Sequence, residues 1–192
     1  MEGNPEGRFQ KIYILTGKTG SGKSTFLGDI VVRIRSMDLC VGGFIAASIE
    51  DKKASRFYEI RDLSSSQTMP LASEEARAGW MRTGSFYFNP EALSLGYRIL
   101  TDPVVCENDL IVVDEIGPFE LEDKIWADAI TCLLDNCSCP MLWTVRKQLI
   151  KEVTGKWQLE NIEIIDIEKY SVDQAAGIIL SQNTGQPPVN MV

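Results

Sequence analysis

Three glycines and two lysines are concentrated in the stretch LTGKTGSGKST, residues 15–25, between a short apolar run and a segment with helical spacing. Glycine weakens helices and strands, so its concentration here indicates a turn with a special backbone requirement. Gly17, Gly22, Lys23 and Ser24 match the pattern G-x-x-x-x-G-K-[ST]. In that pattern the backbone N–H groups curl around phosphate oxygens, and the following helix directs its positive end at them. The stretch therefore predicts a phosphate-binding loop between a strand and a helix.

The loop also predicts individual roles. Lys23 is expected to reach the β- and γ-phosphates of a nucleotide, where it would act in catalysis, and Ser24 to offer its hydroxyl to Mg²⁺. Chance produces this pattern in on the order of one chain in a hundred of this length, which disfavours a glycine-rich turn that binds nothing. The residues expected to contact the nucleotide are Gly17, Lys18, Thr19, Gly20, Ser21, Gly22, Lys23, Ser24 and Thr25.

Two adjacent acids end the apolar segment LIVVDEIG, residues 110–117. A buried strand of an open α/β sheet brings ligand-binding residues to its carboxyl end, which predicts Asp114 as a holder of Mg²⁺. Glu115 should point elsewhere because neighbouring side chains on a strand diverge. There it could orient and deprotonate an attacking water molecule. An ordinary solvated strand end is the alternative, and the phosphate-loop pattern upstream disfavours it.

Strands and helices alternate along the chain, which predicts an α/β fold of the P-loop NTPase type, with three α/β/α layers and a mainly parallel sheet. Strands are expected at 11–16, 41–49, 56–63, 110–117, 141–145 and 162–167, and helices at 23–37, 90–100, 125–134 and 171–180. Asn89 precedes Pro90 and could cap the second helix. The polar segment 64–79 is expected to form a surface loop or short insertion.

The length of 192 residues predicts one domain, residues 1–192, with a loose leader at 1–10 and a loose tail at 183–192. A net charge of −8 disfavours nucleic acid as a partner, and no protein partner is indicated. No apolar run approaches the roughly 18 residues that cross a bilayer, and the start of the chain lacks a secretory signal, so a cytoplasmic location is expected.

The chain contains no histidine, so any general base must be a carboxylate, lysine, tyrosine or cysteine. It contains five cysteines, an odd number, and the run CLLDNCSC fits no common zinc spacing. These cysteines are expected to be buried or incidental thiols.

Several segments in succession resemble the THEP1-like nucleoside-triphosphatases, over roughly residues 11–170. They are LTGKTGSGKST, VGGFIAAS, Arg56–Phe57, RTGSFYF, LIVVDEIGPFEL and MLWTVRK. The resemblance implies a compact P-loop protein that hydrolyses ATP, GTP and other nucleoside triphosphates with weak base preference and depends on Mg²⁺. It also implies that Glu115 is the second acid of the family, and that Gly117 and Glu120 complete its signature.

The chain departs from the family pattern at three places. Ser48 and Glu50 stand where an acid and an arginine usually follow the glycine–phenylalanine strand, and Val145 stands where a histidine precedes Arg146. The segment DIEKYSVD has no counterpart of the Asn-Arg-Asp run that follows the last strand, which leaves the base pocket unassigned.

An arginine is expected to stabilise charge on the transferring phosphoryl group. Arg56, Arg82 and Arg146 each adjoin an expected strand end or loop, and Arg56 and Arg146 are preferred because they coincide with family motifs. For each, a solvated surface arginine is the alternative. Lys18 could project over the γ-phosphate or into solvent.

Three function classes remain open. The first is a Mg²⁺-dependent nucleoside-triphosphatase, the second a small P-loop kinase that phosphorylates a metabolite, and the third a nucleotide-switched adaptor with slow ATPase activity. A kinase usually needs an arginine-bearing lid, and segment 64–84 holds only Arg77 and Arg82. A guanine-selective switch is disfavoured because no Asn/Thr-Lys-x-Asp sequence occurs.

Overall fold

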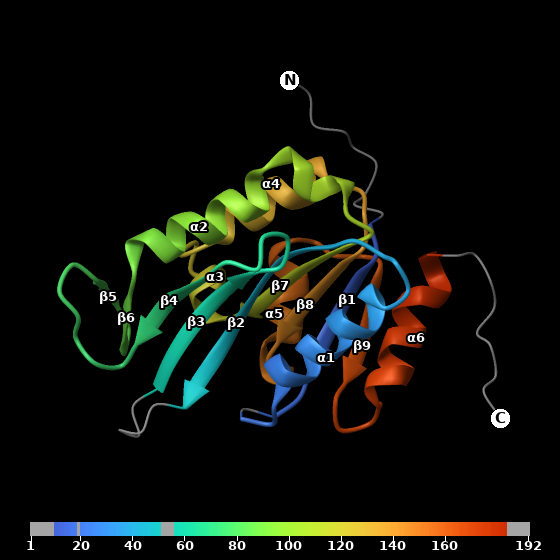
Figure 1. The fold of residues 1–192 in the computed structure, drawn as a ribbon, viewed down its shortest axis with the longest axis horizontal. Helices are drawn as coiled ribbons and strands as arrows, with labels where there is room; N and C mark the ends of the chain where they lie inside the picture. Colours follow the sequence, from blue (N-terminus) through green and yellow to red (C-terminus); the bar gives the residue numbers. More distant parts are fainter. Residues whose placement is uncertain (1–9, 19, 51–55, 184–192) are drawn as a thin grey trace.

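The structure is a computed structural model that describes residues 10–18, 20–50 and 56–183 (Figure 1). Thr19, expected in the phosphate loop, lies outside the described residues, as do nearly all of the leader at 1–10 and the tail at 183–192. Within the described part of the chain, no helix combines the length and apolar character needed to cross a membrane.

The centre of the fold is a nine-stranded sheet in the order β5-β6-β4-β3-β2-β7-β8-β1-β9, counted over the described residues. The strands are β1 Ile12–Thr16, β2 Val41–Glu50, β3 Arg56–Asp62, β4 Thr68–Ser73, β5 Met81–Thr83, β6 Phe86–Phe88, β7 Leu110–Ile116, β8 Met141–Val145 and β9 Ile162–Asp166. The sheet is mixed: β2, β7, β8, β1 and β9 run parallel to one another, and β3 to β6 add an antiparallel extension beside β2.

Helices cover both faces of the sheet, which confirms the expected α/β/α layers (Figure 1). They are α1 Lys23–Arg35, α2 Pro90–Thr101, α3 Pro118–Leu121, α4 Ala127–Asn136, α5 Ile150–Lys156 and α6 Val172–Asn183, with short 3-10 turns η1 Pro103–Glu107 and η2 Lys147–Leu149. Two helices, α1 and α6, pack on one face, whereas α2, α4 and α5 pack on the other. The Asn89 side chain accepts from the Glu91 N–H, so the expected cap of α2 is present.

Successive side chains of the central strands point to opposite faces of the sheet, so the hydrophobic core is divided into two parts, one on each face. In β7, Ile111 and Val113 face α2 and α4, and Leu110 and Val112 face α1. Full burial on both faces explains why the central parallel strands are continuous apolar runs in the sequence. This burial makes the sheet a rigid base for the side chains at its carboxyl end.

The segment 64–79 was expected to form a surface loop or short insertion, and the loop expectation is wrong for residues 68–73, which form β4. The sequence of β4 includes Pro70, which cannot donate to a sheet ladder and so weakens the local strand signal. Pro70 sits opposite Glu59, next to a register shift at which β4 has one more residue than β3. Antiparallel pairing with β3, which directly precedes it in the chain, and with β6 makes this segment a strand.

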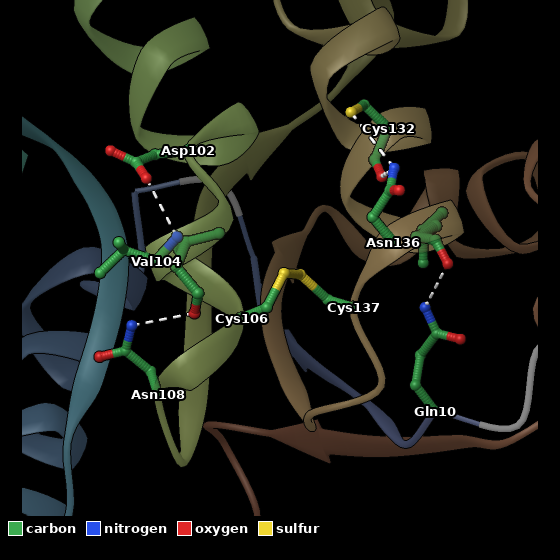
Figure 2. Close-up of a disulfide and its surroundings, with 10 residues drawn as sticks. Gln10, Asp102, Val104, Cys106, Asn108, Cys132, Asn136 and Cys137 are labelled. Carbon is green, nitrogen blue, oxygen red and sulfur yellow. Dashed lines mark hydrogen bonds between the residues drawn. A yellow bond between two sulfur atoms is a disulfide. The ribbon is translucent and has the colours of Figure 1, made fainter.

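A disulfide joins Cys106 in η1 to Cys137 after α4, with the Cα atoms 5.2 Å apart (Figure 2). The expectation that the cysteines are incidental thiols is therefore wrong for this pair, whereas Cys40, Cys132 and Cys139 are free. The bond closes a loop of 31 residues and links the two segments that end α2 and α4.

Candidate active site

The glycine-rich loop connects the end of β1 to the start of α1 at the carboxyl edge of the sheet. Gly20 and Gly22 have φ angles of 76° and 84°, in the left-handed region that favours glycine. At Gly17 a Cβ atom would lie 2.7 Å from Cγ1 of Ile167, so a larger residue would push the loop away from the segment after β9. The glycines are thus required by the backbone shape and by close packing.

The two lysines of the loop have different surroundings. The Lys23 side chain is nearly buried, and its Nζ donates to the carbonyl oxygen of Lys18 at 3.1 Å, which places the ammonium over the loop. The Lys18 side chain is 79% exposed and pairs with Glu168 at 3.1 Å. Of the two positions expected for Lys18, the structure has the one toward solvent. Lys23 is therefore the cation inside the loop.

The first turn of α1 is free to bind an anion. Its N-cap residue, Gly22, has no side chain that could cap it, and the turn contains no acidic residue. Arg33 and Arg35 lie in the last turn, where cations complement the helix dipole. The N–H groups and the positive end of the helix are consequently directed at the space enclosed by the loop.

Asp114 lies on the face of β7 that packs against α1, and it is almost completely buried. Its carboxylate accepts hydrogen bonds from the Ala46 N–H at 3.0 Å, from the Thr144 hydroxyl and from Ser24. Burial, with a smaller contribution from the charge of Glu115, raises the pKa of Asp114 to about 7. A carboxylate and a hydroxyl from the phosphate loop are oxygen ligands of the kind Mg²⁺ binds, and a cation there would offset the desolvation of Asp114. The residues present therefore fit a magnesium ion.

A bulge in β7 separates the two acids. Between Val113 and Ile116, β7 has one more residue than the matching part of β8, and Glu115 has φ of 64°. The Glu115 N–H donates to Thr144 Oγ1 at 2.6 Å. Its carboxylate turns to the opposite face from Asp114, toward Arg146. The expected divergence of the two side chains is present, and a left-handed backbone, rare for a residue with a Cβ, contributes to it.

Thr144 connects the two acids and was not singled out from the sequence. Its hydroxyl donates to Asp114 and accepts from the Glu115 N–H, so one buried side chain on β8 fixes both residues of β7. The only sequence signal is a threonine in the otherwise apolar strand MLWTV. A single threonine does not reveal which residues it contacts; that becomes clear only from the strand order, which places β8 beside β7.

The arginines expected near the reacting phosphate separate into two groups. Arg146 follows β8, and its guanidinium lies 3.8 Å from the Glu115 carboxylate. Arg56 instead lies 3.7 Å from Glu74 across the β3–β4 pair, and Arg82 lies over the Tyr87 ring. The structure therefore brings Arg146 to Glu115, and it places Arg56 and Arg82 on the antiparallel extension.

The segment after β9 borders the loop on its other side. Asp166 accepts from the Glu168 N–H at 3.1 Å and from Lys147 Nζ at 3.2 Å, and the first of these bonds is the main cause that lowers the pKa of Asp166. Ile167 packs on Gly17 and Glu168 pairs with Lys18, so this segment is held against the phosphate loop.

Glu120, expected from its motif, lies buried in α3. Its carboxylate accepts from the Gly117 N–H at 2.9 Å, which holds the turn after β7. Burial is the main cause that raises the pKa of Glu120 from its ordinary value of 4.5 to about 7. Glu120 therefore acts on the position of the turn that follows Glu115.

The raised pKa of Glu120 predicts a specific pH dependence of stability. Between pH 4.5 and 7, Glu120 is protonated in the folded protein but ionised in the unfolded chain. The free energy of unfolding therefore decreases as the pH rises through this range. Glu120→Gln removes this titrating carboxyl group, and the amide oxygen can still accept the hydrogen bond from the Gly117 N–H. The stability of Glu120→Gln relative to wild type should increase by up to about 3 kcal/mol between pH 5 and pH 8.

Urea unfolding at both pH values, without nucleotide or metal, measures this difference. Glu122→Gln, which changes an exposed carboxylate two residues away, is the matched control. A stability difference between Glu120→Gln and wild type that is the same at both pH values would contradict the role of burial at Glu120.

Comparison with known proteins places this geometry in a family. The family model described as NTPase matches residues 12–180. Among curated relatives, nucleoside-triphosphatase THEP1 of Hyperthermus butylicus is 28% identical over 180 residues, covering 90% of this chain and 94% of the relative. The THEP1 protein of Thermofilum pendens is 30% identical over 139 residues, covering 72% of this chain and 75% of the relative.

Two solved structures share the fold. The solution structure of a human cancer-related nucleoside triphosphatase superposes with a TM-score of 0.66 at 19% identity, covering 93% of this chain and 99% of that chain. The crystal structure of THEP1 from Aquifex aeolicus superposes with a TM-score of 0.65 at 21% identity, covering 89% of this chain and 98% of that chain. With a family match over nearly the whole described sequence and a phosphate loop facing the buried Asp114, the chain belongs to the NTPase family and is a nucleoside-triphosphatase.

Proposed function

We propose that the protein hydrolyses the γ-phosphate of nucleoside triphosphates in a Mg²⁺-dependent reaction. The observation that carries the proposal is the junction at Thr144, which fixes Asp114 toward the phosphate loop and Glu115 toward Arg146. A metal-facing acid and a separate acid beside an arginine are the groups that this reaction requires. We further propose that residues 1–192 form a single domain, supported by the common sheet that joins the strands.

The loop residues bind the triphosphate. The N–H groups of residues 20–24 and the N-terminus of α1 surround phosphate oxygens, and Lys23 places its ammonium beside the β- and γ-phosphates. Ser24 and Asp114 would hold Mg²⁺, which neutralises developing charge on the phosphate oxygens when bound. In this structure the Lys23 ammonium donates to the carbonyl oxygen of Lys18, and it would exchange this hydrogen bond for one to a phosphate oxygen when a nucleotide binds.

Glu115 is the proposed general base. It accepts a proton from water as the water oxygen forms a bond to the γ-phosphorus and the bond between that phosphorus and the β–γ bridging oxygen breaks, which gives inorganic phosphate and a nucleoside diphosphate. Arg146, 3.8 Å from Glu115, orients the carboxylate and supplies positive charge at the same place. We propose Arg146 for this role in preference to Arg56, which would have to leave Glu74 to take part.

Weak selectivity among bases is part of the proposal. The segment after β9, which borders the loop, presents Ile167, Glu168 and Lys169, and the sequence lacks the Asn/Thr-Lys-x-Asp pattern that reads guanine. Rates for ATP, GTP, CTP and UTP should agree within about a hundredfold, which corresponds to about 2.7 kcal/mol of discrimination.

A phosphate-release assay over these four substrates, with Mg²⁺ and with excess chelator, tests both the reaction and its selectivity. Hydrolysis should require the metal with every substrate. Equal rates in chelator would contradict the metal requirement, and one substrate preferred by more than a hundredfold would reveal a dedicated base pocket.

A further inference from the structure

A cavity of about 100 Å³ lies beside Glu115 on the face of the sheet opposite α1. Its polar edge is formed by Glu115, Arg146 and Glu120, and the turn Gly117–Pro118 also borders it. The side chains of Glu115 and Arg146 are 34% and 39% exposed, so this edge meets solvent. The proposed general base thus borders this cavity. Hydrolysis does not require such a cavity, because water is the only substrate besides the nucleotide.

The opposite walls of the cavity are aromatic. Tyr58, Phe86, Phe88 and Phe119 form a continuous series of edge-to-face contacts, with ring centroids 5.7, 6.4 and 5.5 Å apart in that order. Trp126 completes the wall and packs on Phe44. These rings come from β3, β6, α3 and the start of α4, so the cavity is built by the antiparallel extension together with the turn after β7. Rings locked against one another form a preformed apolar surface.

The polar groups at the cavity are suited to a hydroxyl compound. The Tyr58 phenol is protonated at neutral pH and can donate a hydrogen bond, and burial, and next the negative charge of Glu115, raise its pKa further. Glu115 can accept one. A hydroxyl placed between these groups would lie at the same carboxylate that we propose as the base for water.

The size of the cavity limits the ligand to about one ring. An apolar cavity of about 150 Å³ binds benzene in an engineered protein, so a space of about 100 Å³ encloses at most part of one ring, and the rest of a single-ring ligand would lie in the opening to solvent. The aromatic walls favour a flat or compact apolar body, and the opening at Glu115 and Arg146 favours a polar group at one end.

We propose that this cavity is an acceptor site, in which a small alcohol with a single-ring body receives the γ-phosphoryl group in place of water. The proposal rests on the proposed function because it uses the nucleotide bound at the phosphate loop. The alcohol oxygen forms a bond to the γ-phosphorus, and the bond between that phosphorus and the β–γ bridging oxygen breaks. The hydroxyl proton passes to Glu115 and then to solvent, leaving a phosphate monoester and a nucleoside diphosphate.

The experiment supplies ATP and Mg²⁺ to the full-length protein with benzyl alcohol, 2-phenylethanol or cyclohexylmethanol, and follows the products by phosphorus NMR. Toluene, which has the ring of benzyl alcohol without the hydroxyl, is the matched compound. A phosphate monoester should form with at least one alcohol and increase as inorganic phosphate decreases. Toluene should give no monoester.

Two variants locate the site. Ala72 is buried in β4 and lines the cavity, so Ala72→Leu should fill the space and lower monoester formation by about tenfold, the equivalent of about 1.4 kcal/mol. If Ala72→Leu does not fold, Phe86→Ala removes a half-buried part of the wall and should have the same effect. Ala78→Leu introduces the same side chain at an exposed position of the same region and should leave monoester formation unchanged.

The outcomes separate the two proposals. Hydrolysis of ATP with no monoester from any of the three alcohols would overturn the acceptor site and leave the proposed hydrolysis standing. Monoester formation that persists unchanged in both Ala72→Leu and Phe86→Ala would show that the acceptor binds elsewhere, and would equally overturn it. Absence of both nucleotide binding and hydrolysis in the wild type would instead refute the proposed function.

Discussion

Glu115→Gln should lower single-turnover hydrolysis of ATP by about 10²- to 10⁴-fold, the usual effect of losing a general base. The amide keeps the shape of the side chain, and the Glu115 N–H can keep its bond to Thr144 because that bond comes from the backbone. Removing a negative charge beside the phosphates should leave nucleotide affinity equal or higher. The sequence holds no histidine that could take over the proton.

The measurement is a pair of experiments under saturating Mg²⁺: nucleotide affinity at equilibrium and the single-turnover rate. Asp114→Asn is the contrasting variant, because changing the metal-facing acid should reduce binding and rate together. Hydrolysis by Glu115→Gln within threefold of wild type would refute the proposed base. A loss of affinity as large as the loss of rate would make Glu115 a metal-binding or structural residue.

Lys23→Ala should have an effect of similar size on the overall reaction. The ammonium over the loop is the cation expected at the β- and γ-phosphates, and removing one such group from a site with positioned charges lowers the rate by about 10²- to 10³-fold. Because Lys23 also binds the ground state, nucleotide affinity should fall as well. Phosphate release at subsaturating ATP reports both losses at once.

Two comparisons make the Lys23→Ala result interpretable. Lys151→Ala removes an exposed lysine on α5 and should hydrolyse ATP as the wild type does. The melting temperature of Lys23→Ala without nucleotide shows whether the variant is folded. A folded Lys23→Ala protein with the wild-type rate at subsaturating ATP is incompatible with the assigned loop.

The parts of the site that could be predicted from sequence are those encoded within a few consecutive residues. The loop is one such part, because its glycines, Lys23 and Ser24 must occur at fixed spacing for the backbone to enclose a phosphate. Asp114 is another, since a buried strand that ends in an acid brings that acid to the ligand-binding edge of the sheet.

The parts that could not be predicted depend on which strands become neighbours. Thr144 acts on Asp114 and Glu115 only because β8 pairs with β7, and an isolated threonine in an apolar strand does not encode this pairing. The left-handed backbone at Glu115 arises from the bulge against β8, which has no local signature.

The cavity and the disulfide were missed for the same reason. The cavity walls come from strands β3, β4 and β6 and from the turn after β7, and each aromatic residue by itself is an ordinary core residue. The sequence gives the number of cysteines and not their pairing, so Cys106 and Cys137 meet only because η1 lies beside the end of α4 (Figure 2).

The insertion of β8 between β1 and β7 also sets a length. Two inter-strand spacings, about 10 Å, separate the strand that leads into the phosphate loop from the strand that carries Glu115. In the proposed reaction the loop after β1 binds the nucleotide and Glu115 on β7 accepts the proton, so β8 holds the base one extra strand away from the loop. The inserted strand therefore sets how far the proposed base stands from the phosphate loop.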